Sequence, residues 1–414
     1  DEILTDAGAK IYTDSSQLKT ADFIFKVNAP SENEISFYKE NSILIASLNP
    51  YNNSEIIKKL QTQKTISFAM ELMPRITRAQ SMDVLSSQSN LAGYQAVIEA
   101  SHIFNKAMPM MMTAAGTIAP AKVMVFGAGV AGLAAIGTST SLGAITYAFD
   151  VRPEVAEQVE SMGAEFVFLD FESEQEDGAS TGGYAAVSSP EFSAAQLAKF
   201  REIAPEIDIV ITTALIPNRE APELWTSDMV ASMKPGSVIV DLAAEKGGNC
   251  KLTVMDERIV TDNGVVIIGY TDFPSRMAEQ ASMLYASNIR HMIADLTPEK
   301  DGVITHNMED DIIRGATVVH DGEITYPPPP PKVQAIAARP KEKTPEKPPA
   351  KPQRNPSQTP RTAPPSQLTL PRPPAPPQTD TPHHAHPPTT VTREPDPTHQ
   401  HHPPPIHSRQ TQQQ

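Results

Sequence analysis

Three glycines with a spacing suited to phosphate binding follow an apolar run that is typical of a strand. Gly127, Gly129 and Gly132 form a G-x-G-x-x-G pattern, and small apolar residues continue to about residue 141 as an expected helix. In such a pattern the first glycine allows a tight turn, the second lets the backbone approach a pyrophosphate, and the third lets the helix pack closely. The free N–H groups at the helix start attract phosphates. The pattern favours dinucleotide binding, with a plain glycine-rich turn between strand and helix as the alternative.

A carboxylate follows at the position where a dinucleotide fold binds ribose. Asp150 ends a second apolar run, 144–149, and lies 23 positions after Gly127. There a carboxylate accepts a hydrogen bond from the ribose 2′-hydroxyl and repels a 2′-phosphate, so NAD(H) is favoured over NADP(H). Arg152 lies two residues further on and weakens this preference, because a nearby cation can accommodate the phosphate.

A second set of polar residues precedes the glycine motif. Arg75, Gln80 and Asp83 bring a cation, an amide and a carboxylate onto one short loop-to-helix segment. A helix start with a solvated face explains the same residues. Residues 1–326 show no Ser-His-Asp, Cys-His or metal-ligand pattern, so we expect no metal site. Hydride transfer between two nicotinamides needs orientation and exclusion of water rather than a general acid or base.

Composition limits the class of protein. The 414 residues allow two or three domains. The excess of 49 Asp and Glu over 34 Lys and Arg argues against nucleic-acid binding. Cys250 is the sole cysteine, which excludes a disulfide framework and favours a reducing compartment. No apolar run reaches the roughly 18 residues that span a bilayer, and no signal peptide opens the chain. The start, DEILTDAG, has no Met and indicates a truncated or processed amino terminus.

Apolar runs alternate with helical patterns along residues 1–326, which predicts parallel α/β sheets. The amino-terminal region has expected strands at 10–12, 23–27, 43–48 and 66–70, with helices at 31–40 and 54–63. A helix at 90–106 leads to the glycine motif, and the methionines of 108–112 are expected in the core, with a soft ligand surface as the alternative. Further strands at 123–126, 144–149, 165–169, 207–214, 237–242 and 265–269 predict a six-stranded doubly wound domain.

These patterns predict a domain at 1–112, truncated at its amino end and completed by 275–326, and a nucleotide-binding domain at 113–274. A helical pattern at 275–296 is expected to pack back on the first domain. After Tyr326, 27 of the 40 prolines and 7 of the 11 histidines occur, which predicts a disordered Pro/His-rich tail at 327–414.

Four longer stretches, 70–94, 123–144, 212–250 and 269–289, resemble the NAD(H)-binding component, domain I, of proton-translocating NAD(P) transhydrogenase. The likeness covers about residues 1–326. It implies two Rossmann-like doubly wound parallel-sheet domains with NAD(H) in the cleft between them, and a homodimer. It also implies direct hydride exchange with NADP(H) on a partner domain III, coupled to proton movement through a membrane domain II. The chain would then be peripheral, on the cytoplasmic or mitochondrial-matrix face of the inner membrane.

The resemblance also implies roles for single residues. Arg75 and Asp83 would hold the carboxamide and its ribose region, and Gln80 would reach toward the partner nicotinamide; these three are the expected catalytic residues. Gly183 and Tyr184 match a loop that closes over the nucleotide. The remaining expected nucleotide-binding residues are Ile76, Thr77, Ser86, Gly127, Gly129, Val130, Gly132, Asp150, Val151 and Leu215.

Two other interpretations stay open. Alanine dehydrogenases resemble this fold, but they typically carry Asp-Gln before paired glycines, where this chain has Glu245 and Lys246 before Gly247 and Gly248. The other alternative is a catalytically silent NAD-binding fragment. Family members usually have further residues before the first matched strand. Some continue after the matched region into membrane helices, where this chain has its tail, so it is not expected to conduct protons itself.

Overall fold

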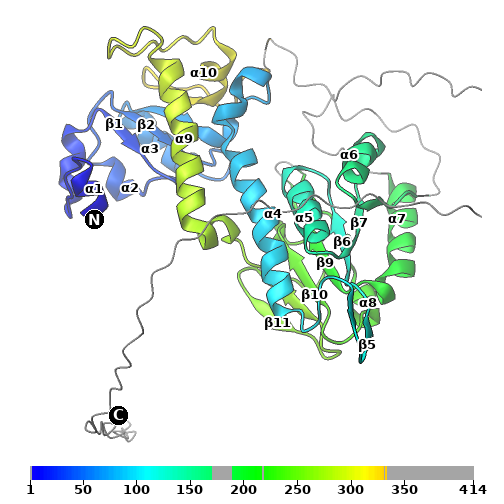
Figure 1. The fold of residues 1–414 in the computed structure, drawn as a ribbon. Helices are drawn as coiled ribbons and strands as arrows, with labels where there is room; N and C mark the ends of the chain where they lie inside the picture. Colours follow the sequence, from blue (N-terminus) through cyan, green and yellow to red (C-terminus); the bar gives the residue numbers. More distant parts are fainter. Residues whose placement is uncertain (1, 170–188, 217–218, 331, 333–414) are drawn as a thin grey trace, which may run out of the picture. The chain divides into compact units, whose positions relative to one another are not determined.

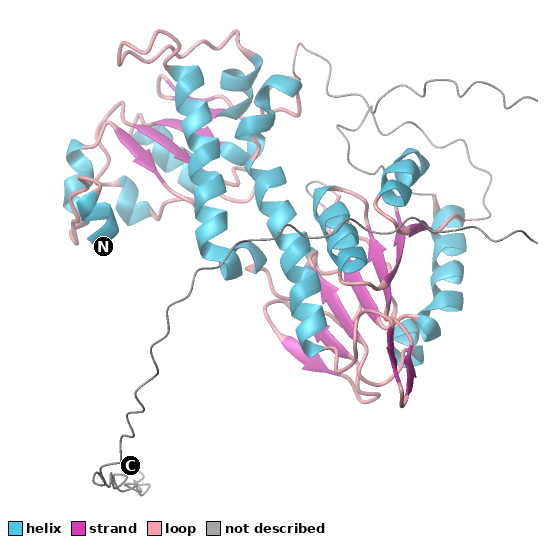
Figure 2. Ribbon diagram, viewed as in Figure 1, coloured by secondary structure: helices cyan, strands magenta, loops and turns pink. Residues whose placement is uncertain are grey.

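The computed structural model describes residues 2–169, 189–216, 219–330 and 332. Their helices and strands form two α/β sheets and a small two-stranded hairpin, as Figures 1 and 2 show. The α/β class with parallel sheets predicted from the sequence is confirmed. The expected disordered tail and the loop with Gly183 and Tyr184 lie outside the described residues, except for 327–330 and 332.

The first sheet has the order β1-β2-β3-β13-β14. β2 is buried on both faces: Ile43 and Ile45 pack on one core, whereas Leu44 and Ala46 pack on another. β13 pairs antiparallel with β3, so a strand from after residue 316 joins strands from before residue 70. The strands are β1 Phe23–Phe25, β2 Ile43–Ala46, β3 Ile66–Ala69, β13 Thr317–His320 and β14 Glu323–Ile324, and the nearby helices are α1 Glu2–Asp6, α2 Glu32–Ile35, α3 Ser54–Thr62 and α10 Asp311–Ala316.

The second sheet has the order β11-β12-β10-β9-β6-β7-β8. Along β6, Val123 and Val125 face a core that includes α5 and α6, whereas Met124 and Phe126 face a core that includes α7 and α8. The all-apolar run is therefore buried on both faces, as a doubly wound sheet requires. The strands are β6 Lys122–Phe126, β7 Ile145–Phe149, β8 Glu165–Phe166, β9 Ile209–Thr212, β10 Val238–Asp241, β11 Arg258–Val260 and β12 Val266–Ile268, and the helices are α5 Val130–Ser141, α6 Ala156–Ser161, α7 Pro190–Ile203 and α8 Ser227–Ser232.

Two long helices, α4 Val84–Ile103 and α9 Ala278–Leu296, contact each other (Figure 1). α9 contributes Tyr285, Ile289 and Met292 to the core beneath β2 and β3. α4 packs on α5 so closely that a Cβ on Gly93 would lie 2.0 Å from the carbonyl oxygen of Ala131. The two helix backbones therefore meet at this glycine, which sets the distance between α4 and the glycine turn at the start of α5.

Three sequence predictions about elements were wrong. The second sheet has seven described strands rather than six, because β11 pairs antiparallel at the edge; its half-exposed Arg-Ile-Val pattern does not stand out as a buried run. Residues 10–12 form no strand, since Ile11 and Tyr12 are exposed. The helix expected at 90–106 begins earlier, at Val84, where the Asp83 side chain caps its first turn.

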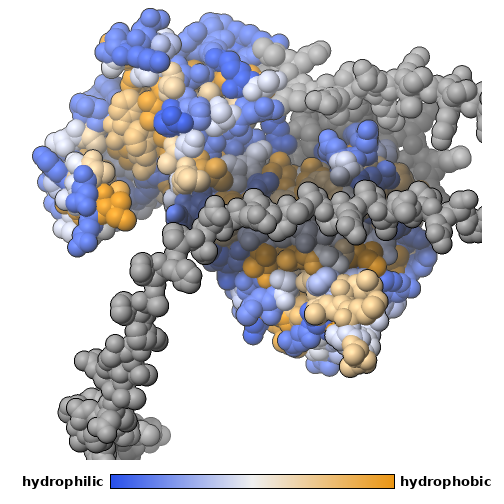
Figure 3. Space-filling model, in the orientation of Figure 1, coloured by the Kyte–Doolittle hydropathy of each residue, from blue (hydrophilic) through white to orange (hydrophobic). Residues whose placement is uncertain are grey.

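The methionine cluster was also placed wrongly in the core. Only Met108 is buried, whereas Met110, Met111 and Met112 are 60%, 45% and 76% exposed. The chain turns back in a hairpin of β4 Met111–Thr113 and β5 Gly116–Ile118, which projects as pale apolar surface in Figure 3. A short two-stranded ribbon without a sheet on either face leaves these side chains in solvent.

Candidate functional site

Each glycine of the turn after β6 is required for a different physical reason. Gly127 has φ +92°, a left-handed conformation that favours glycine, and its N–H donates to the carbonyl of Phe149 at 2.8 Å. A Cβ on Gly132 would lie 1.7 Å from the carbonyl oxygen of Gly127, so only glycine lets α5 pack against the turn. Apart from its neighbours along the chain, no residue has an atom within 4 Å of the place where a Cβ on Gly129 would be. Gly129 therefore keeps open the space through which a ligand can approach the backbone.

The first turn of α5 is suited to an anion. Gly129 is the N-cap residue, and no side chain caps the helix. The N–H groups at the start of an α-helix have no partner within the helix and carry the positive end of its dipole. Because glycine supplies no capping oxygen, a phosphate oxygen can take that position.

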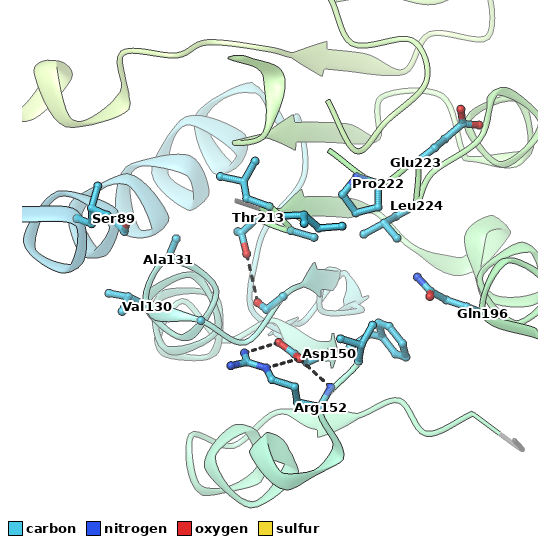
Figure 4. Close-up of a pocket in the computed structure, with 18 of the residues that line it drawn as sticks. Ser89, Val130, Ala131, Asp150, Arg152, Gln196, Thr213, Pro222, Glu223 and Leu224 are labelled. Atoms are coloured by element: carbon cyan, nitrogen blue, oxygen red, sulfur yellow. Dashed lines mark hydrogen bonds and ion pairs between the residues drawn. The ribbon is translucent and has the colours of Figure 1, made fainter. Parts of the chain in front are cut away.

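Asp150 and Arg152 form a close ion pair beside the turn (Figure 4). Asp150 is 8% exposed, and its carboxylate accepts a 2.7 Å hydrogen bond from the backbone N–H of Ala128. The Arg152 side chain donates to both carboxylate oxygens at 2.9 Å, and these bonds raise the pKa of its guanidinium. The expected ribose carboxylate therefore lies next to the glycine turn, already paired with a cation.

These groups line a cavity of about 410 Å³. The turn and the end of β7 supply Gly127, Gly129, Val130, Asp150 and Val151, whereas Arg75 and Ser86 come from the segment before α4 and its first turn. Leu215, after β9, closes a further side. Eight residues expected at the site from the sequence thus share one cavity.

Other expected residues lie elsewhere. Ile76 is buried in the core of the first sheet, and Thr77 and Gln80 are exposed on a 3₁₀ turn, η3 Thr77–Met82, that does not line the cavity. Asp83 accepts hydrogen bonds from the Ser86 backbone N–H at 2.9 Å and from its hydroxyl at 2.6 Å. Gly132 acts in helix packing, and Gly183 and Tyr184 lie outside the described residues.

A buried amide on α9 holds the segment that carries Gln80 and Asp83. Asn288 is 6% exposed; its Nδ2 donates to the Ser81 carbonyl and its Oδ1 accepts from the Ser87 hydroxyl, both at 2.8 Å. The two contacts flank Asp83 in the sequence. α9 thereby fixes the turn between η3 and α4 through Asn288.

A second cavity of about 520 Å³ shares Leu85, Ser89, Ala131, Thr213 and Leu215 with the first. It extends toward Ser47, Tyr270 and Tyr285, so the two form neighbouring compartments along α4. Its described lining residues include the acids Glu245 and Asp272 but neither Lys nor Arg.

Sequence reasoning missed several residues that shape these cavities. The Thr213 hydroxyl donates to the carbonyl of Phe126 at 3.0 Å and lies 3.4 Å from the carbonyl oxygen of Gly127, where β9 meets the glycine turn. Asn249, fully buried, accepts from the N–H of Ala214 at 3.0 Å and donates to its carbonyl at 2.9 Å. Gln196 reaches the cavity from α7. Thr213 follows β9 and Asn249 lies in the loop after the neighbouring strand β10, whereas Gln196 comes from a helix.

Among the residues that the structure describes, no group of three or more His, Cys, Asp or Glu side chains could hold a metal ion. No helix in the same portion of the chain is long and apolar enough to cross a membrane.

Comparison with known families agrees with this architecture. Residues 1–92 match the family model of the alanine dehydrogenase/PNT N-terminal domain, and residues 96–327 match that of the alanine dehydrogenase/PNT C-terminal domain. The chain belongs to the alanine dehydrogenase/PNT family. The boundary between the two models lies within α4, the helix that contacts both the first-sheet helix α9 and the glycine-turn helix α5.

Within this family the chain is similar to transhydrogenase subunits. NAD(P) transhydrogenase subunit alpha of Cereibacter sphaeroides is 62% identical over 84% of this chain, which spans 66% of that protein's length. The same subunit of Haemophilus influenzae is 51% identical over 83% of this chain and 66% of its own length. A transhydrogenase structure from Sinorhizobium meliloti matches with 46% identity and a TM-score of 0.69, over 78% of this chain and 86% of its own. The resemblance inferred from the sequence is confirmed.

Proposed function

We propose that the chain binds NAD(H) in the 410 Å³ cavity and exchanges a hydride directly with NADP(H) held by a separate partner domain. The observation that carries this proposal is the convergence on one cavity of an open Gly129, an α5 N-terminus without a side-chain cap, and the Asp150 carboxylate. Together they match a pyrophosphate followed by an adenosine ribose. The names of the similar transhydrogenase subunits support the same conclusion.

The nicotinamide end would lie on the α4 side of the cavity, toward Arg75 and Ser86. Arg75 offers hydrogen-bond donors for the carboxamide, and Asp83, held by Ser86, orients the adjoining ribose. Gln80 is exposed on η3, where it can reach a second nicotinamide brought by a partner. In this proposal the protein contributes orientation and exclusion of water, because a hydride that passes between two nicotinamides releases no proton to a side chain.

We propose further that the chain acts in a larger assembly. The partners would be an NADP(H)-binding domain III and a proton-conducting membrane domain II, which would hold this chain peripherally on the cytoplasmic or matrix face of the inner membrane. A homodimer completes the proposal, and the exposed Met111 and Met112 of the β4–β5 hairpin are apolar surface that self-association would cover.

The alternative is an alanine dehydrogenase-like reaction, which requires a site for the substrate carboxylate. The described lining of the second cavity has no Lys or Arg and includes Glu245 and Asp272, so it disfavours an anionic substrate. A catalytically silent NAD-binding fragment remains the third possibility.

One assay separates the three functions. The chain is mixed with an isolated NADP(H)-binding domain of a transhydrogenase, and reduction of an NADP⁺ analogue by NADH is followed spectroscopically. Transfer that needs both proteins supports the proposal. Reduction of NAD⁺ by alanine with this chain alone would instead support the dehydrogenase reaction. A mixture that binds NADH but transfers no hydride would favour the catalytically silent fragment.

A further inference from the structure

Four hydrogen bonds from donors of the chain itself occupy the carboxylate of Asp150. Oδ1 accepts from the backbone N–H and the Nε of Arg152, both at 2.9 Å. Oδ2 accepts from the N–H of Ala128 at 2.7 Å and from Nη2 of Arg152 at 2.9 Å. An ionised carboxylate offers about four acceptor positions. A ribose hydroxyl can therefore bind Asp150 only if one of these donors leaves.

The donors differ in how easily they can move. The two backbone N–H groups belong to the glycine turn and to the end of β7, which are joined by the hydrogen bond from Gly127 to Phe149. The guanidinium of Arg152, in contrast, stands at the end of a flexible side chain that is 18% exposed and lines the same cavity. Figure 4 shows the Arg152 guanidinium beside the Asp150 carboxylate, with dashed lines joining the two.

We propose that Arg152 is an internal competitor for the adenosine ribose and sets both the affinity and the selectivity of the nucleotide site. This inference rests on the proposed NAD(H) site. To bind Asp150, the ribose hydroxyls of NAD(H) must replace the bidentate, charge-assisted hydrogen bonds from Arg152. Arg152 therefore lowers the affinity of the site for NAD(H). The displaced guanidinium stays tethered two residues from Asp150, where its positive charge offsets the repulsion between Asp150 and a 2′-phosphate. Arg152 therefore also weakens discrimination against NADP(H).

The test uses Arg152→Met in the full chain, with NADH, NADPH and reduced nicotinamide mononucleotide titrated by fluorescence. Because the substitution frees carboxylate acceptors for the ribose, it should tighten NADH binding by about three- to tenfold, the range that one net hydrogen bond contributes. The mononucleotide has no adenosine ribose, so its affinity should not change. NADPH should bind more weakly than to the wild type, because the Asp150 charge is no longer offset.

Unchanged or weaker NADH binding in Arg152→Met would overturn the inference, as would an equal gain for the mononucleotide. Arg152→Gln repeats the measurement with a polar side chain, should the Met variant fold poorly. A wild-type chain that binds no NADH would overturn the proposed function and this inference together. A wild-type chain that binds NADH without a gain in the variants would overturn only the role of Arg152.

Discussion

Substitution of Gly129 by alanine separates nucleotide binding from folding at the glycine turn. Apart from its neighbours along the chain, no residue has an atom within 4 Å of the added Cβ, and Gly129 has φ −80°, which alanine adopts readily. The fold should lose only the difference between glycine and alanine as N-cap, about 0.5–1 kcal/mol. The same methyl group occupies the space that a bound pyrophosphate would use.

The expected loss of NADH affinity follows from the bonds that the methyl group blocks. A hydrogen bond to a charged phosphate contributes about 1.5–3 kcal/mol, so one lost bond raises the dissociation constant of NADH about 10- to 150-fold. Fluorescence titration of NADH and urea unfolding of the same samples measure both effects.

Two further glycines serve as controls. Gly137→Ala, within α5, would meet only the flexible end of Met162 at 2.7 Å and should keep both stability and affinity. Gly132→Ala would place a methyl group 1.7 Å from a backbone carbonyl oxygen and should unfold the turn itself. Normal NADH affinity in a folded Gly129→Ala chain would refute the assignment of the pyrophosphate to this turn.

Three other predictions concern hydride transfer, helix packing and the dependence of stability on pH. Gln80→Asn shortens an exposed side chain and should slow hydride transfer in the reconstituted mixture about tenfold, because a misplacement near 1 Å can cost about 100-fold in rate. The affinity for NADH should not change. An unchanged rate would remove Gln80 from the site. Gly93→Ala should push α4 from α5 and lower the free energy of unfolding by about 1–3 kcal/mol in urea titrations, and full stability would contradict this close contact. The pKa of His306 is lowered from 6.5 to about 4, chiefly by burial and also by His320, with Asp321 opposing. Between pH 6.5 and pH 4 this histidine is therefore protonated in the unfolded chain but neutral in the folded chain. The free energy of unfolding should fall by on the order of 1–2 kcal/mol as the pH drops toward 4, after allowance for the partial exposure of the side chain. His306→Gln should flatten this loss, and an equally steep loss in the variant would assign it to other groups.

The glycine-turn half of the candidate site was predictable from the sequence because its determinants are local. The strand, the three glycines, the helix and Asp150 follow one another within thirty residues, and β6, α5 and β7 begin and end within one residue of their predicted bounds. The start of α4 was also visible in principle, since Asp83 directly before an apolar pair is an N-cap signal. The apolar pattern after residue 90 is longer, and the predicted helix was therefore started at residue 90 instead of Val84.

The other half depends on contacts between distant segments. Asn288 supports the turn after Ser81 across more than two hundred residues, and Gly93 matters only because α5 lies against it. Arg152 beside Asp150 was noticed from spacing alone, but that its side chain occupies both carboxylate oxygens required coordinates. The exposed methionines of the hairpin were misplaced for the same reason, since composition does not reveal which apolar side chains find a partner.

The proposed function requires that a hydride pass directly from the nucleotide in this cavity to one on a partner. The most direct measurement uses NADH deuterated at the transferred C4 position, with the chain, an NADP(H)-binding domain and NADP⁺, and mass analysis of the NADPH formed. Direct transfer predicts that the deuterium is retained in NADPH when the reaction runs in ordinary water. Loss of the label to solvent, or formation of labelled NADPH without this chain, would contradict direct transfer at this cavity.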